Sequence, residues 1–182
     1  MNEFFAQVDW AVIGIKLLSL TALLFFSKQT LKELLFDKPS ADIREQVESS
    51  LFMLVAFTFV WHLLGSYISY SFSKSEMTYE QQVQVYYFFF SFYEVLGLSL
   101  LAMCHWLKKC SFSKVCRWVY YLSTGMVALH LVRYLDRVYF ETDYLDSVYM
   151  PIKTGLNIAT LVLVGAYPVM RLIKLKPFYR WE

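Results

Sequence analysis

The stretch that decides the fold is "SLFMLVAFTFVWHLLGSYISYSF", residues 50–72, which contains no lysine, arginine, aspartate or glutamate. A helix rises about 1.5 Å per residue and needs about 20 apolar residues to cross some 30 Å of hydrocarbon. Because lipid offers the backbone no hydrogen-bond partners, a segment of this kind must satisfy its own amides as a helix. The stretch therefore predicts a transmembrane helix.

Other apolar segments surround it, at residues 10–26, 83–106, 115–137 and 150–170. The whole chain of 182 residues is 58% hydrophobic and 18% charged, whereas soluble domains carry about 25% charged residues. We predict an all-α integral membrane protein, a single transmembrane helical domain over residues 1–182 with about five helices. The count falls to four if one segment does not cross, since the first is short and the fourth ends in polar residues.

The distribution of basic residues predicts the orientation. The loop 27–49, the loop after the third segment and the tail 171–182 are rich in lysine and arginine. The loop after the second segment contains only Lys74, and the one after the fourth is acidic. By the positive-inside rule the N-terminus lies outside and the C-terminus and loop 27–49 are cytoplasmic. The expected location is the inner (plasma) membrane of a bacterium.

Within the loop 27–49, two short features are expected. "LKELLF", residues 31–36, has the pattern of an amphipathic turn lying along the inner interface. Pro39 then breaks the chain, and Ser40 is expected to be the N-cap of the helix that leads into 50–72.

The predicted spans also carry polar residues at spacings of three, four and seven, which place them on one helix face. A charged side chain at a span centre costs about 2.5–3.5 kcal/mol on insertion scales and is expected to face the bundle interior. We predict an intramembrane polar cluster of Glu94, His62, His130, Arg133, Lys16 and Asn157. An outer mouth is predicted from Tyr134, Asp136, Arg137 and Lys153. Lys16 or Arg133 is the expected partner of Glu94.

This cluster favours a channel-like or sensing subunit that forms a homo-oligomer in the lipid bilayer. One alternative is an accessory anchor or signalling subunit that binds a cytoplasmic protein through 27–49 and 171–182, for example in a bacterial stress or phage-defence system. Another is a haem electron-transfer protein in which His62 and His130, at similar depths on two spans, are the axial ligands.

Several classes of function are not predicted. The net charge of +2 is too small to indicate nucleic-acid binding. The chain has no HExxH, GxSxG or paired-aspartate motif, so no enzymatic activity is expected. Cys104, Cys110 and Cys116 lack CxxC spacing and are expected to be free thiols. Apart from the haem alternative, no cofactor or metal is predicted.

Overall fold

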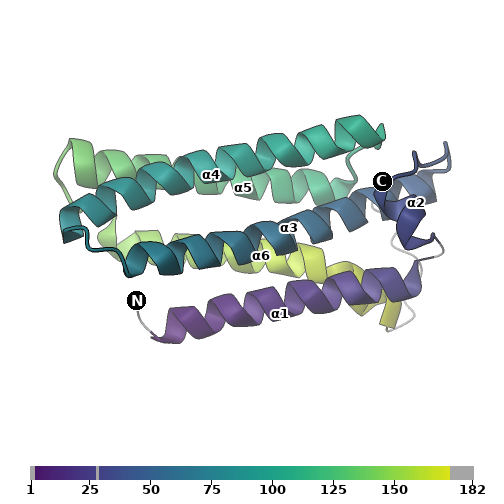
Figure 1. The fold of residues 1–182 in the computed structure, drawn as a ribbon, viewed down its shortest axis with the longest axis horizontal. Coiled ribbons are helices and arrows are strands. Elements are labelled where there is room, and N and C mark those ends of the chain that lie inside the picture. The colour runs from purple at the N-terminus through teal and green to yellow at the C-terminus, as the bar shows by residue number, and fades with distance from the viewer. Residues whose placement is uncertain (1–2, 28, 173–182) are drawn as a thin grey trace.

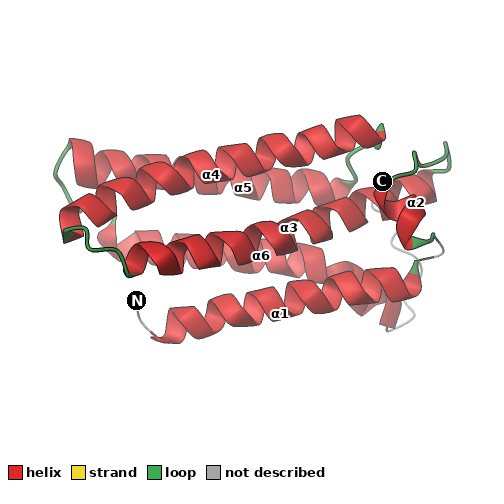
Figure 2. Ribbon diagram, viewed as in Figure 1, coloured by secondary structure: helices red, strands yellow, loops and turns green. Residues whose placement is uncertain are grey.

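The computed structural model describes residues 3–27 and 29–172, which fold into a helical bundle (Figures 1 and 2). The elements are α1 (Glu3–Phe26), α2 (Leu31–Leu35), α3 (Ile43–Ser73), α4 (Tyr79–Lys108), α5 (Lys114–Tyr134), the π-helix η1 (Leu135–Tyr139) and α6 (Asp146–Leu172). The long helices lie alongside one another, and each runs opposite to the one before it (Figure 1). No strand occurs in the described residues, so the predicted all-α fold is confirmed.

Three of these helices are long and apolar enough to cross a membrane. They are α3, α4 and the part of α6 from Asp146 to Ala166, and they agree with the predicted spans at 50–72, 83–106 and 150–170. Helix α1 contains a shorter apolar stretch, Trp10–Phe26. The chain therefore has the long apolar helices that are typical of an integral membrane protein.

Most helices extend beyond the apolar segments because capping residues lie outside them. Helix α3 begins at Ile43, and the carboxylate of Asp42 accepts the N–H of Arg44 at 2.9 Å. The prediction of Ser40 as the N-cap is therefore wrong, since Asp42 is the residue that supplies the side-chain acceptor. Helix α4 begins after Thr78, which forms a capping box with Gln81.

The loops at the two ends of the bundle differ in lysine content. We call the end with the turns at 74–78 and 140–145 the acidic-loop end, and the end with the loops at 29–42 and 109–113 the basic-loop end (left and right in Figure 1). At the basic-loop end "LKELL" forms the single turn α2, as expected, capped by Thr30 and Glu33. The ammonium group of Lys108 donates to the carbonyls of Glu33, at 3.2 Å, and of Leu34. Lys108 thereby holds α2 against the end of α4.

The half of the bundle near the basic-loop end is filled by an apolar core. All the long helices contribute, with Leu23, Leu51, Leu54, Val55, Leu101, Val115, Cys116, Val119 and Val164. Leu54 and Cys116 are fully buried. Burying such side chains contributes about 1.5–3 kcal/mol each relative to exposure to water.

One polar network, centred on His105, crosses this core. The Nδ1 of His105 lies 3.0 Å from the carbonyl of Leu101, so Nδ1 carries the hydrogen and Nε2 is the acceptor. The hydroxyl of Ser50 lies 3.1 Å from Nε2, and Ser50 Oγ in turn accepts the N–H of Ser113 at 3.0 Å. The network ties α3, α4 and the start of α5 together.

Replacing Ser50 with alanine is expected to destabilise the fold by about 1–2 kcal/mol, because the N–H of Ser113 loses its acceptor and Nε2 of His105 retains only the Sγ of Cys116, 3.7 Å away. The measurement is unfolding by SDS in mixed micelles. Ser99→Ala is the control, since the Ser99 hydroxyl is exposed and bonds only to its own helix. Equal effects of the two substitutions would show that the network contributes nothing.

The cysteines of this region are free thiols. The thiol of Cys110 donates to the carbonyl of Gln46 at 3.3 Å, and burial raises the pKa of the Cys110 thiol to about 11. Because the thiolate is the reactive form, we expect Cys110 to react with maleimide at pH 7.5 roughly 100-fold more slowly in the folded protein than after unfolding. Mass spectrometry of the labelled peptides measures the ratio, and labelling of Cys110 at the unfolded rate would contradict its burial.

Candidate functional site

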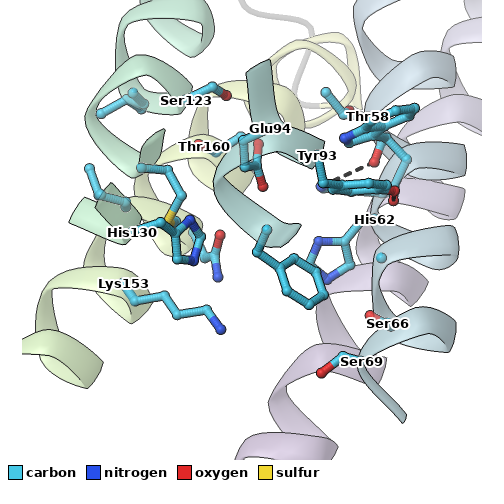
Figure 3. A pocket seen from close by; sticks show the side chains of 18 of the residues that line it. Thr58, His62, Ser66, Ser69, Tyr93, Glu94, Ser123, His130, Lys153 and Thr160 are labelled. Atoms are coloured by element: carbon cyan, nitrogen blue, oxygen red, sulfur yellow. Dashed lines mark hydrogen bonds between the residues drawn. The ribbon is translucent and has the colours of Figure 1, made fainter. Parts of the chain in front are cut away.

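The half of the bundle near the acidic-loop end contains a partly open cavity of about 140 Å³. A dry cavity of about 150 Å³ holds a benzene ring, which gives the scale. Helices α1, α3, α4, α5 and α6 all line it, and its ionisable and amide side chains are Lys16, His62, Glu94, His130, Lys153 and Asn157. Figure 3 shows side chains from opposite sides of the cavity converging on it.

The predicted polar cluster is therefore largely brought together. Every member except Arg133 lines the cavity. Lys153, which the sequence placed at the outer mouth, lines it as well. The residues meet because each helix presents polar positions at helical spacing, such as Thr58, His62 and Ser66 on α3.

The charged groups act on one another across the cavity. The ammonium of Lys16 donates to the carbonyl of Thr58 at 3.3 Å, and that of Lys153 donates to the hydroxyl of Tyr86 at 3.4 Å. Both positive charges act on the carboxylate of Glu94. The cationic groups that accompany Glu94 are thus Lys16 and Lys153. Two ammonium groups and one carboxylate line a site of low dielectric constant, where such interactions are stronger than in water.

His130 is the polar side chain that the fold leaves least satisfied. Its exposed fraction is 2%, and within the described residues neither ring nitrogen has a hydrogen-bond partner. Its ring lies between those of Phe90 and Tyr149, with centroids 6.3 and 6.2 Å away, and it points into the cavity (Figure 3). A buried polar group without a partner costs about 1–3 kcal/mol, so a cavity occupant that bonds to it is favoured.

An aromatic stack forms one wall. Trp61 lies between Phe57 and Tyr93, with ring centroids 5.3 and 4.2 Å apart, and the Tyr93 hydroxyl donates to the carbonyl of Trp61 at 2.6 Å. The indole rests on Gly97, where a Cβ atom would lie 2.5 Å from Trp61 Nε1. Trp61 was not among the residues predicted for the site, although its position next to His62 on α3 was a usable signal.

Arg133 belongs to a separate ion cluster just beyond the cavity. Its guanidinium lies 2.8 Å from Asp136, 2.8 Å from Asp146 and 3.1 Å from Asp143. Arg137 also contacts Asp143. This cluster joins the end of α5, η1, the loop at 140–145 and the start of α6, so it closes the acidic-loop end of the bundle.

The other residues predicted for the outer mouth also lie in or near this cluster. Asp136 is buried and accepts a hydrogen bond from the hydroxyl of Thr142 at 2.6 Å. Tyr134 packs its ring against Phe88, with centroids 6.1 Å apart. Thus, of the residues predicted for the mouth, only Lys153 lines the cavity.

The histidine pair of the haem alternative does line one cavity. His62 and His130 are contributed by α3 and α5 (Figure 3). A cavity of about 140 Å³ is close to the space that a benzene ring needs and far smaller than a porphyrin requires. A haem bound by both imidazoles would therefore have to extend beyond this cavity. Among the described residues, no group of three or more His, Cys, Asp or Glu side chains could hold a metal ion.

The surfaces predicted to bind a cytoplasmic partner are described only in part. The tail 171–182 lies, from residue 173 onward, outside the described residues. The loop region forms α2 and the start of α3, which border a groove of about 500 Å³. Acidic side chains outnumber basic ones in its lining, which includes Glu33, Asp37, Asp42, Glu45 and Glu48 as well as Lys38 and Arg44.

Comparisons of the chain with models of protein families, with curated proteins and with solved structures find no match. The cavity, the ion cluster and the groove are therefore the features from which a function can be inferred.

Proposed function

We propose that this protein is a membrane-embedded sensing subunit, and that the cavity in one half of its bundle binds a small polar ligand. One observation carries the proposal: none of the residues of the apolar core, such as Leu54 and Val55, lines the polar cavity, and only a narrow pocket of about 40 Å³ continues from it beside Leu101 and Val119. A channel needs a continuous pathway for hydrated ions. A polar site closed on one side by packed aliphatic side chains supports binding rather than conduction through a single chain.

The same proposal includes a topology. Helices α1, α3, α4, α5 and α6 would cross the bilayer, with the acidic-loop end and the N-terminus outside and the C-terminus in the cytoplasm. The basic residues at the basic-loop end, such as Lys38, Lys109 and Lys114, support this orientation. The exposed side chains of Leu31 and Phe36 around α2 support an interfacial position for this turn. In a bacterium the membrane would be the inner one.

Cysteine accessibility tests the proposal. A charged, membrane-impermeant thiol reagent added to the outside of intact cells is expected to modify Ser69→Cys, on the cavity wall, but not Val55→Cys, in the core. The unsubstituted chain controls for its native cysteines. Modification of Val55→Cys from either side, or ion flux through reconstituted protein above that of empty liposomes, would instead support a conducting pathway. Protection of Ser69→Cys from both sides would overturn the proposal.

Self-association is part of this proposal. Gly125 and Gly155 are exposed on the outer surface of the bundle, and a Cβ at Gly155 would meet nothing within 4 Å. Small exposed residues of this kind support close helix contacts between copies of the chain in lipid. Light scattering of the purified protein, corrected for detergent, measures the oligomeric state, and a monomer at all concentrations would contradict it.

A second candidate function is an accessory anchor for a cytoplasmic partner, such as one in a stress or phage-defence system. The groove beside α2 favours it, because acidic side chains there would attract a basic segment of the partner. A photo-crosslinking residue at Asp37 is expected to form a discrete adduct in cells if this function holds. The matched control is Lys109, which is exposed at the same end of the bundle but does not line the groove, and equal crosslinking at both positions would contradict docking.

A further inference from the structure

We infer that the ligand of the cavity is a small organic monoanion, a carboxylate whose body is no larger than about one aromatic ring. The inference rests on the proposed ligand-binding function and names the class of ligand. Three observations carry it: the position of His130, the charges that line the cavity, and the composition of its remaining walls.

His130 supplies the directional contact. Both nitrogens of its buried ring lack a hydrogen-bond partner within the described residues, and the ring points into the cavity (Figure 3). A neutral imidazole has one N–H donor and one acceptor nitrogen. A ligand oxygen that accepts this N–H would satisfy a group that the fold itself leaves without a partner.

The charges select the sign of the ligand. The ammonium of Lys153 points into the cavity between the two imidazoles (Figure 3), and its charge acts on Glu94, His62 and His130. Lys16 adds a second ammonium group on the α1 side. With two ammonium groups and one carboxylate, an entering anion is attracted and an entering cation is repelled on balance. A carboxylate can accept from His130 and interact with Lys153 at once.

The size and walls of the cavity limit the rest of the ligand. About 140 Å³ is the space of a benzene-sized molecule. Phe90 and Tyr93 offer aromatic faces, while Met126 and Leu156 offer aliphatic ones. A bare inorganic anion would leave these apolar walls without a contact, whereas an organic body of this size packs against them.

An isosteric series of probes tests the charge preference. Benzoate, benzamide and benzamidinium have nearly the same shape but charges of −1, 0 and +1. Binding to the full chain in phosphatidylcholine nanodiscs is measured by ligand-observed NMR and titration calorimetry. Benzoate is expected to bind at least tenfold more tightly than benzamide, with benzamidinium weakest. Equal binding of the three, or preference for benzamidinium, would overturn the inference.

Variants locate the binding. His130→Leu is expected to weaken benzoate binding at least tenfold, and His130→Gln, which retains a donor, to restore most of it. Lys153→Met is expected to abolish the preference for benzoate over benzamide. Thr124→Val is the matched control, because the exposed Thr124 hydroxyl on the same helix bonds only to its own backbone. Benzoate affinity that is unchanged in His130→Leu would overturn the inference.

The remaining outcomes separate this inference from the proposed function. Tighter binding of chloride or nitrate than of benzoate would contradict the inference that the ligand has an organic body. If none of the probes binds while Ser69→Cys is accessible from outside, the inferred ligand class is wrong, but the proposal that the cavity is a ligand-binding site still stands. If Ser69→Cys is also protected, the proposed function fails with it.

Discussion

Replacing Gly97 with valine is expected to destabilise the protein by about 3 kcal/mol, at the upper end of what overpacking costs. The Cβ of any larger residue here would lie 2.5 Å from Nε1 and 2.7 Å from Cε2 of Trp61. The indole cannot turn aside easily, because it is stacked between Phe57 and Tyr93. Helices α3 and α4 must then separate, and the wall of the cavity moves with them. Unfolding by SDS in mixed micelles measures the loss.

Gly14→Val is the matched control, since a Cβ at Gly14 meets nothing within 4 Å, and its effect is expected to stay within about 0.5 kcal/mol. Combining Gly97→Val with Trp61→Leu removes the clash and is expected to cost less than the sum of the single changes. Strict additivity would show that the indole is not the obstacle. Accessibility of Ser69→Cys in the Gly97→Val background would show whether the cavity collapses or opens.

The helices could be predicted from the sequence because their cause is local. Runs such as 50–72 have no charged residue and can only be helical in lipid. The inward face was also predictable, because the spacing of His62 and Ser66, or of Lys153 and Asn157, is that of one side of a helix. The helix starts were less predictable, since a cap such as Asp42 lies well outside the apolar run.

Sequence periodicity shows which residues share a helix face, but it does not show at what depth in the bundle each of them contacts other helices or loops. His130 and Arg133 are three residues apart on α5 and share its inward face, yet His130 lines the cavity and Arg133 contacts the loop. The difference depends on how residues 140–145 fold back, with Glu141 at φ 52° and η1 in a π-helical turn. Nothing in "LDRVY" indicates a π-helix.

Similarly, Glu94 and His105 lie on the inward side of α4 but are separated by about 16 Å at the rise of an α-helix. One lines the cavity, and the other belongs to the network within the core. A polar stripe read from the sequence therefore merges two sites that the fold separates.

Replacing Arg133 with methionine is expected to lower the thermal midpoint by roughly 5–10 °C, as removal of one partner from a buried ion pair does in a chain of this length. Arg133 and Asp136 have side chains only 5% and 7% exposed. Methionine retains much of the apolar stem but leaves these carboxylates without the guanidinium. Arg137→Met is the matched control. Its side chain is 32% exposed, so we expect a shift of no more than about 2 °C.

The same variant tests whether the ion cluster and the cavity are separate. From the sequence, Arg133 was a candidate partner of Glu94, which predicts that Arg133→Met and Glu94→Gln are coupled. In the structure Arg133 instead forms ion pairs with three aspartates, and Glu94 interacts electrostatically with Lys16 and Lys153. We therefore expect the effects of the two substitutions to add within about 0.5 kcal/mol. A larger coupling would mean that the ion cluster closing the acidic-loop end responds to the charge inside the cavity.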